Sequence, residues 1–169
     1  FFGFKLKKPD FKIRSITKDE FKRLISTPLE SKSLCFIRDM FVFAAFTGLP
    51  YVDLKQLTWK EIITEEDGSL WISTDRQKTG IPFHVKLLDI PMQIIEKYRG
   101  LGEGDNVFHL LGQGRINYAL KIIAKHCNIT TKLTFHVGRH HLLSYSLKIS
   151  SLYEYLYKIG NDLETSKVL

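Results

Sequence analysis

Apolar positions recur at helical spacing near the start of the chain. Phe21, Leu24 and Ile25 fall on one face of a helix, so this segment has an apolar stripe and a polar remainder. Thr17 and Glu20 stand three residues apart just before the stripe, which is the spacing of a capping box. The pattern therefore predicts an amphipathic helix that begins at Thr17.

Two further helices are predicted before residue 60. The first runs from Lys32 to Phe46, and its end, MFVFAAF, is apolar on every side, which is typical of a helix buried in the middle of a domain. Gly48 ends it, because glycine accepts the backbone conformation that closes helices. A short helix follows from Val52 to Leu57, with Leu54 and Leu57 facing inward.

The middle of the chain changes from helical spacing to alternation. Residues 70–75 and 83–87 alternate between apolar and polar side chains, and the segment KTGIP between them is rich in turn residues. The segment WKEII stands before the first of these runs. Together they predict a small antiparallel sheet of three strands.

Helical patterns return after the sheet. IPMQIIEKYRG predicts an amphipathic helix with Pro91 at its start and Gly100 at its end. Further helices are predicted from Arg115 to Cys127 and from Phe135 to Lys148. The expected fold is thus mainly helical, with a small three-stranded antiparallel sheet inserted on one side.

Composition and charge narrow the range of partners. Lys and Arg total 25 against 18 Asp and Glu, a net charge of +7 that favours an anionic partner, most commonly nucleic acid. No apolar run approaches the length that crosses a bilayer, so no membrane association is expected. Cys35 and Cys127 stand far apart and form no metal-binding or redox pair, which favours a reducing, cytoplasmic location.

The first fifteen residues interleave basic and aromatic side chains around Pro9. We interpret residues 1–15 as an extended linker that follows a missing N-terminal domain and lies along DNA; a solvated leader is the alternative. The chain begins without Met, so we expect it to be a piece of a longer protein.

The segment FHVGRHH concentrates candidate chemistry. His136 and Arg139 are three residues apart and share a helix face, and His140 lies close to that face. A guanidinium gives planar, permanent donors and an imidazole donates or moves a proton, so the pair suits a phosphate or a carboxylate. A polar helix face with a core histidine is the plainer interpretation. No metal is expected, because no acid or cysteine is suitably placed and Arg139 would repel a cation.

Four segments strengthen the phosphate interpretation. FTGLPYVDLKQLTWKEI, a hairpin carrying Lys78 in RQKTG, FHVGRH and KIGNDLETSKVL occur in this order. Their order and spacing resemble the catalytic domain of the tyrosine recombinase (phage integrase) family, from Ile16 to Leu169. The likeness is greatest to integrases of bacterial mobile elements such as conjugative transposons, whose first box often reads TGL-x-Y-x-D and whose hairpin has an arginine two residues before its lysine.

The resemblance implies a reaction and a set of roles. The family cleaves and rejoins DNA through a 3′-phosphotyrosyl intermediate, without metal or other cofactor, and so serves recombination and integration. Arg139 corresponds to the second family arginine, which clamps the scissile phosphate, and His136 to the histidine of the same box. Lys78 corresponds to the general acid, and His140 to a supporting residue near the DNA.

The chain departs from the family at three places. Pro50 stands where the first family arginine follows TGL, and we expect Arg76 to supply the missing guanidinium, since residues two apart in a strand share a face; a solvent-facing Arg76 is the alternative. Asn161 stands where the third box has His or Trp, and can donate a hydrogen bond without charge. The family spacing puts the nucleophilic tyrosine just after Leu169.

Three explanations for that last departure stay open. The chain is truncated before the tyrosine, its tail was omitted, or the protein is a degenerate homologue that binds DNA without cleaving it. We expect residues 1–15 to be linker and residues 16–169 to be the catalytic domain, inactive by itself without the tyrosine.

The expected partner is double-stranded DNA. The resemblance implies a homotetramer on recombining DNA with exchange of C-terminal tails, and a monomer for this chain alone. The residues expected to contact DNA are Lys5, Lys7, Lys8, Lys12, Lys55, Thr79, Arg115 and His140.

Overall fold

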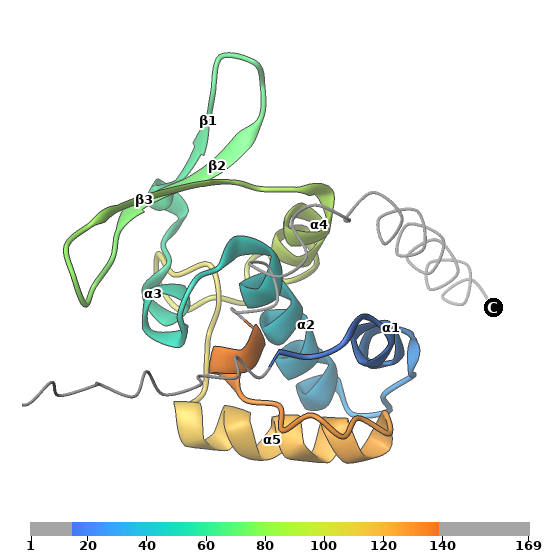
Figure 1. Cartoon of the computed structure of the whole chain (residues 1–169). Coiled ribbons are helices and arrows are strands. Elements are labelled where there is room, and N and C mark those ends of the chain that lie inside the picture. Colours follow the sequence, from blue (N-terminus) through green and yellow to red (C-terminus); the bar gives the residue numbers. More distant parts are fainter. Residues whose placement is uncertain (1–14, 139–169) are drawn as a thin grey trace, which may run out of the picture.

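A computed structural model describes residues 15–138 of the chain. Within this part the long helix α2 (Lys32–Thr47) lies at the centre, and α1 (Lys18–Ser26), α4 (Asp89–Lys97) and α5 (Gln113–His126) surround it (Figure 1). A three-stranded antiparallel sheet extends from one side of the helices. The predicted mainly helical fold with a small sheet is therefore confirmed.

Helix α1 begins as the capping box predicts. The Thr17 side chain accepts the backbone N–H of Glu20, and the Glu20 carboxylate accepts the backbone N–H of Thr17 at 3.1 Å. The same carboxylate also accepts the backbone N–H and hydroxyl groups of Thr130 and Thr131, at 2.7–2.9 Å. Glu20 thereby ties α1 to the loop that leads to residues 135–138.

Glu20 is ionised because of these partners. Burial leaves only 4% of the residue exposed and by itself would raise the pKa of the carboxyl group. The hydrogen bonds from Thr131, Thr17 and Thr130 outweigh burial and lower that pKa well below its ordinary value. The contact between α1 and the loop is thus held by a negative charge.

Helix α2 forms the centre of the core. Every residue from Asp39 to Thr47 is buried, as the apolar segment MFVFAAF predicts. Gly48 ends the helix in a left-handed conformation with φ of 71°, which a side chain would strain. Phe43 packs edge-on against Phe108, with ring centres 5.2 Å apart, and so connects α2 to the segment before α5.

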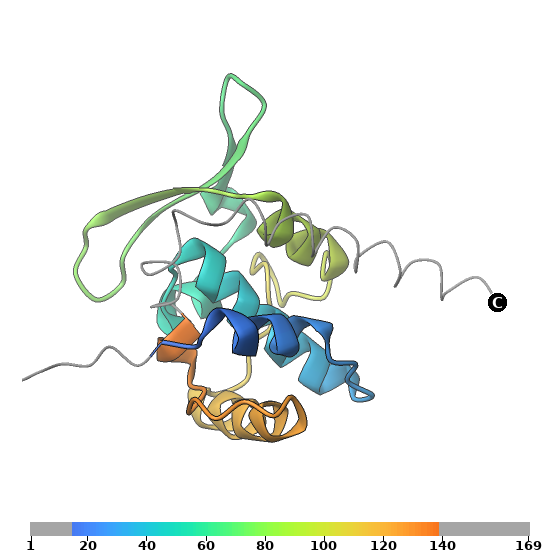
Figure 2. The ribbon, with the colours of Figure 1, turned by 45° about the vertical axis from the view of Figure 1, so that its right-hand side comes forward.

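The sheet consists of β1 (Ile62–Thr64), β2 (Leu70–Asp75) and β3 (Pro82–Lys86), hydrogen-bonded in that order. Ile72 is fully buried and pairs with a residue of each neighbouring strand. Of the segment WKEII, the first three residues form a short 3-10 helix (η1, Trp59–Glu61) and only its end enters β1. The β2–β3 hairpin reaches away from the helices in both ribbon views (Figure 2).

Helix α3 (Tyr51–Gln56) joins α2 to the sheet. Leu54 and Leu57 are buried, as predicted, and anchor this short segment on the core. Pro50 is the residue before the first turn, where its missing N–H removes no helical hydrogen bond. Among residues 15–138, no helix is long and apolar enough to cross a membrane.

Helices α4 and α5 each begin slightly earlier than predicted. Pro91 is the third residue of α4, still within the first turn, where a backbone N–H has no partner inside the helix. Asp39 of α2 fixes α4 by accepting hydrogen bonds from the Lys97 ammonium and the Tyr98 hydroxyl, both at 2.7 Å. Gly112 precedes α5 and takes the N-cap position.

Candidate functional site

Lys78 lies in the turn between β2 and β3. The Arg76 carbonyl accepts the backbone N–H groups of Thr79 (3.2 Å) and Gly80 (2.7 Å), and the Arg76 N–H donates to the Ile81 carbonyl at 3.0 Å. Gly80 has a φ of 63°, which glycine adopts without strain. The backbone of the turn is therefore fixed, while the side chains of Lys78 and Thr79 are exposed.

Arg76 belongs to this turn and not to a strand. Strand β2 ends at Asp75, so the prediction that strand alternation places Arg76 and Lys78 on one face was wrong. The Arg76 guanidinium carbon instead lies 4.4 Å from the centre of the Phe83 ring in β3, a cation–π contact. That contact holds Arg76 beside the base of the turn that carries Lys78.

Asp53 of α3 received no role in the sequence analysis, although it is the last residue of the pattern TGL-x-Y-x-D. It is 7% exposed, and its Oδ1 accepts the backbone N–H of Gln77 at 3.3 Å. Its Oδ2 is buried and has no hydrogen-bond partner among residues 15–138, which is costly for a carboxylate and is frequent at functional sites. The available signal was an acid between two apolar residues, Val52 and Leu54, in a helix expected to pack on the core.

Residues 135–138 form the helical turn that carries His136. The Asn117 side chain of α5 accepts the backbone N–H of Phe135 at 3.0 Å. The Tyr51 ring of α3 packs edge-on against the Phe135 ring, with centres 5.9 Å apart. Phe135 is 1% exposed and anchors the turn, whereas His136 is exposed.

Gly138 allows the same turn to approach α2 closely. A Cβ atom at this position would lie 3.0 Å from a ring carbon of Phe41, tighter than real contacts normally are. The ring of a fully buried phenylalanine has little room to move. The glycine in FHVGRH therefore sets how deeply the turn with His136 sits on the central helix.

Helix α3 contacts both parts of the site. Through Asp53 it holds the turn of Lys78, and through Tyr51 it contacts the residue before His136. In the ribbon views α3 lies between the base of the β2–β3 hairpin and residues 135–138 (Figures 1 and 2). One short helix thus contacts the neighbours of both Lys78 and His136, which are distant in the sequence.

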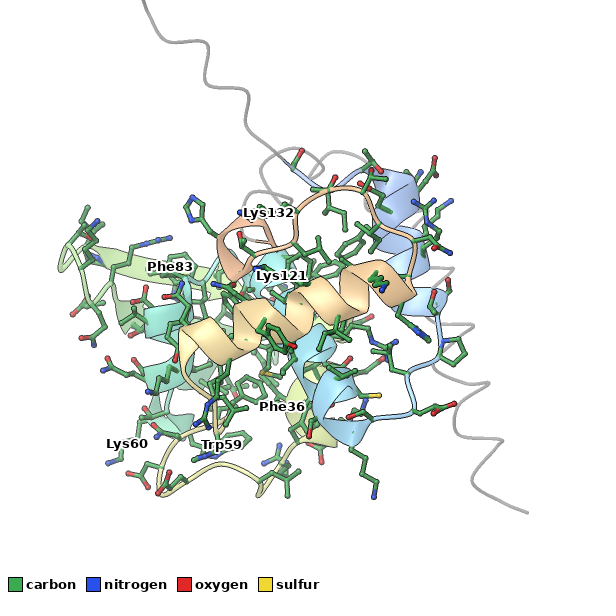
Figure 3. All side chains as sticks on the ribbon, turned by 90° about the horizontal axis from the view of Figure 1, so that it is seen from below. Phe36, Trp59, Lys60, Phe83, Lys121 and Lys132 are labelled. Carbon is green, nitrogen blue, oxygen red and sulfur yellow. The ribbon has the colours of Figure 1, made fainter. Side chains whose placement is uncertain are left out.

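Two predicted DNA contacts lie on helices near this site. Lys55 is exposed on α3 and Arg115 is exposed on α5, and neither pairs with an acid among residues 15–138. Helix α5 has no acidic residue, and its outer surface combines Arg115, Lys121 and Lys125 with Tyr118, which is 67% exposed. Figure 3 shows Lys121 on α5 and Lys132 on the segment beyond it.

Several predicted site residues lie outside the described part of the chain. These residues are Arg139, His140 and Asn161 of the site and Lys5, Lys7, Lys8 and Lys12 of the expected linker.

The other described histidines are exposed surface residues. His84 stacks on Trp71 with ring centres 4.4 Å apart, His109 lies 2.9 Å from Glu103, and His126 lies 3.1 Å from a backbone carbonyl. Within residues 15–138, no group of three histidine, cysteine or acidic side chains could hold a metal ion.

The sequence by itself matches no family model and no curated protein. Solved structures, in contrast, resemble this fold clearly. XerH recombinase bound to its difH substrate in a pre-cleavage complex superimposes with a TM-score of 0.63 at 18% identity, covering 83% of this chain and 45% of that chain. A lambda integrase dimer bound to a COC′ core site gives a TM-score of 0.57 at 22% identity, covering 84% of this chain and 43% of that chain.

The chain thus spans less than half the length of these recombinases. The match to the lambda integrase catalytic core covers 76% of this chain and 83% of that chain, with a TM-score of 0.55 and 20% identity. Identities this low establish the fold alone. The fold is that of tyrosine recombinase catalytic domains.

Proposed function

We propose that this chain is the catalytic domain of a DNA integrase of the tyrosine recombinase type, which cleaves and rejoins DNA strands in site-specific recombination. The observation that carries the proposal is the arrangement around α3, which connects the exposed Lys78 and the exposed His136 within that fold. An amine and an imidazole on separate rigid supports match what transfer of a phosphoryl group requires: an acid and a charge-stabilising donor.

The proposed reaction begins when a tyrosine hydroxyl releases its proton to water and its oxygen attacks the scissile phosphorus. A new bond forms between the tyrosine oxygen and phosphorus, and the bond from phosphorus to the 5′ oxygen breaks. The leaving oxygen takes a proton from the Lys78 ammonium, and the product is a 3′-phosphotyrosyl link with a free 5′-hydroxyl. The link conserves the energy of the broken ester, so rejoining needs neither ATP nor a metal. The family spacing places the tyrosine after Leu169.

The charge on the phosphate oxygens needs cationic or hydrogen-bonding partners in the transition state. We assign this role to Arg139 and His136, with Asn161 as an uncharged donor. Arg76 compensates for the arginine replaced by Pro50. The support for Arg76 is its position beside the Lys78 turn, where the Phe83 ring holds its guanidinium.

DNA contacts beyond the scissile phosphate fall to the basic surfaces. The outer side of α5 is basic and without acids, so we propose that it lies against the DNA backbone, together with Lys55, Thr79 and His140. We also propose that Lys5, Lys7, Lys8 and Lys12 of the linker contact the DNA backbone.

We further propose the assembly and the biological setting. The active form is a homotetramer on two duplexes that exchanges C-terminal tails, whereas this chain alone is a monomer. The motif TGLPYVD and the arginine two residues before Lys78 favour an integrase of a bacterial mobile element, of the conjugative transposon type, acting on DNA in the cytoplasm.

A second candidate is a degenerate homologue that binds DNA and does not cleave it. Pro50 favours it, because proline offers neither charge nor a donor where the family has an arginine. A suicide substrate, whose cleaved 5′ end diffuses away, distinguishes the two with the full gene product. We expect a covalent protein–DNA adduct at a tyrosine. Binding without an adduct would instead support the degenerate homologue.

A further inference from the structure

We propose that Tyr51 is a positioning residue that fixes His136 relative to Lys78, with α3 as the rigid link between the two halves of the site. This inference rests on the proposed function, because positioning matters only if the two side chains act on one phosphate. Tyr51 is the first residue of α3 and directly follows Pro50. It touches no substrate in this proposal and acts through its neighbours.

Tyr51 makes two contacts that converge on the turn of His136. Its ring packs edge-on against Phe135, at an interplanar angle of 82°. Its hydroxyl donates a hydrogen bond of 2.8 Å to the Leu111 carbonyl, just before α5. Helix α5 in turn supplies Asn117, whose side chain accepts the Phe135 N–H. Tyr51 therefore contacts Phe135 directly, and it also contacts the segment before α5, the helix whose Asn117 binds the Phe135 N–H.

The opposite end of the link is Asp53, two residues further along α3. Its Oδ1 accepts the Gln77 N–H, and Gln77 immediately precedes Lys78. Because α3 is short and anchored by the fully buried Leu54, a shift at Tyr51 and a shift at Asp53 are not independent. The distance between Lys78 and His136 is thus set through two side chains of one helix.

The ring contact is the larger of the two contributions of Tyr51. The Phe135 ring is buried, so a smaller partner would leave unfilled space beside the backbone of His136. The hydroxyl bond, in contrast, is exposed to solvent, which can replace it. The two contributions can be separated by substitution, because phenylalanine keeps the ring and leucine does not.

The test compares Tyr51→Leu and Tyr51→Phe in the full gene product, with Tyr98→Phe as the matched control. Tyr98 also donates its hydroxyl, to Asp39, but it connects α2 to α4. We would measure three quantities: the rate of adduct formation on a suicide substrate, the DNA affinity, and the hydrogen exchange of the Phe135 and Gln77 amides. For Tyr51→Leu we expect the rate of adduct formation to fall by about 10-fold or more, with unchanged DNA affinity and faster hydrogen exchange of the Phe135 amide. Tyr51→Phe should recover the rate to within about threefold.

Two results would overturn the inference. One is a Tyr51→Leu rate no lower than that of Tyr98→Phe; the other is unchanged exchange of the Phe135 amide. If the wild-type protein forms no adduct, the proposed function fails instead, and the exchange measurement alone decides whether Tyr51 fixes the turn. An Asp53→Ala variant checks the other end, with faster exchange at Gln77 expected because its acceptor is removed.

Discussion

Lys78 combines a fixed backbone with an exposed side chain. The turn around it closes through the Arg76 carbonyl, and Asp53 fixes the preceding Gln77 amide. The Lys78 ammonium itself has no acidic partner among residues 15–138. The acid role proposed for Lys78 needs a defined position and a proton that no acid already engages, and within residues 15–138 the turn is consistent with both conditions.

Arg76 can be tested against an arginine in the same kind of contact. Arg76 lies over Phe83 at 4.4 Å and Arg99 lies over Trp59 at 4.9 Å, so Arg76→Ala and Arg99→Ala both remove a cation–π contact, and Arg99→Ala also removes an ion pair with Glu96. If Arg76 supplies the guanidinium missing at Pro50, Arg76→Ala should lower the rate of adduct formation by about 10²-fold or more, as expected for a lost oxyanion donor. Arg99→Ala should leave the rate unchanged. Equal rates of adduct formation for the two variants would contradict the catalytic role proposed for Arg76.

Some residues of the site could be predicted from the sequence and others could not. Lys78 and His136 stand within recognisable segments, so a resemblance proposes them, and their catalytic roles stay predictions. Asp53 belongs to the pattern TGL-x-Y-x-D, but its contact with Gln77 could not be predicted, because that contact depends on how a hairpin folds back on α3. The need for glycine at Gly138 depends on the Phe41 ring of a distant helix, which no local pattern reveals.

At the scale of elements, most local signals were reliable, whereas contacts between distant segments could not be predicted. The capping box of Thr17, the left-handed Gly48 and the alternation of β2 and β3 all act over a few residues, and all are confirmed. The strand assumed for Arg76 failed because β2 ends one residue earlier, where the turn closes on the Arg76 carbonyl. The contacts of Glu20 with Thr130 and Thr131 could not be predicted either, because these residues are far from Glu20 in the sequence.

Glu20 makes the stability of the fold dependent on acid. Its pKa is lower in the folded protein than the ordinary value of 4.5, so its contribution is complete above that value and is lost as pH falls below it. We expect Glu20→Gln to lower the free energy of unfolding at pH 7 by about 2–3 kcal/mol, because several hydrogen bonds lose a charged acceptor. Urea unfolding at pH 7 and in steps below pH 5 measures both effects.

The matched control for Glu20 is Glu66→Gln, at an exposed position of the β1–β2 loop. This variant should differ from the wild-type protein by less than about 0.5 kcal/mol and keep its acid dependence. The acid dependence of Glu20→Gln should be shallower than that of both. A dependence of equal steepness in all three proteins would contradict the role of Glu20.

At the scale of the whole molecule, the net charge of +7 and the position of the basic residues predict how DNA binding responds to salt. If α5 lies against the backbone, changing Lys121 and Lys125 to alanine should reduce the slope of log K against log salt by about 2. The control changes Lys60 and Lys86, which pair with Asp105 and Asp67, and should alter the slope less. Identical slopes for the two double variants would place the DNA on another surface.

The central claim is that Lys78 gives a proton to the leaving 5′ oxygen at a phosphate also contacted by His136. Two suicide substrates test it most directly, one with the ordinary bridging oxygen and one with sulfur at that position, because a thiolate leaves without needing an acid. We predict that Lys78→Ala slows adduct formation by about 10²–10⁴-fold on the oxygen substrate and restores a rate close to that of the wild-type protein on the sulfur substrate. Equal slowing on both substrates, or no adduct from the wild-type protein on either, would contradict the claim.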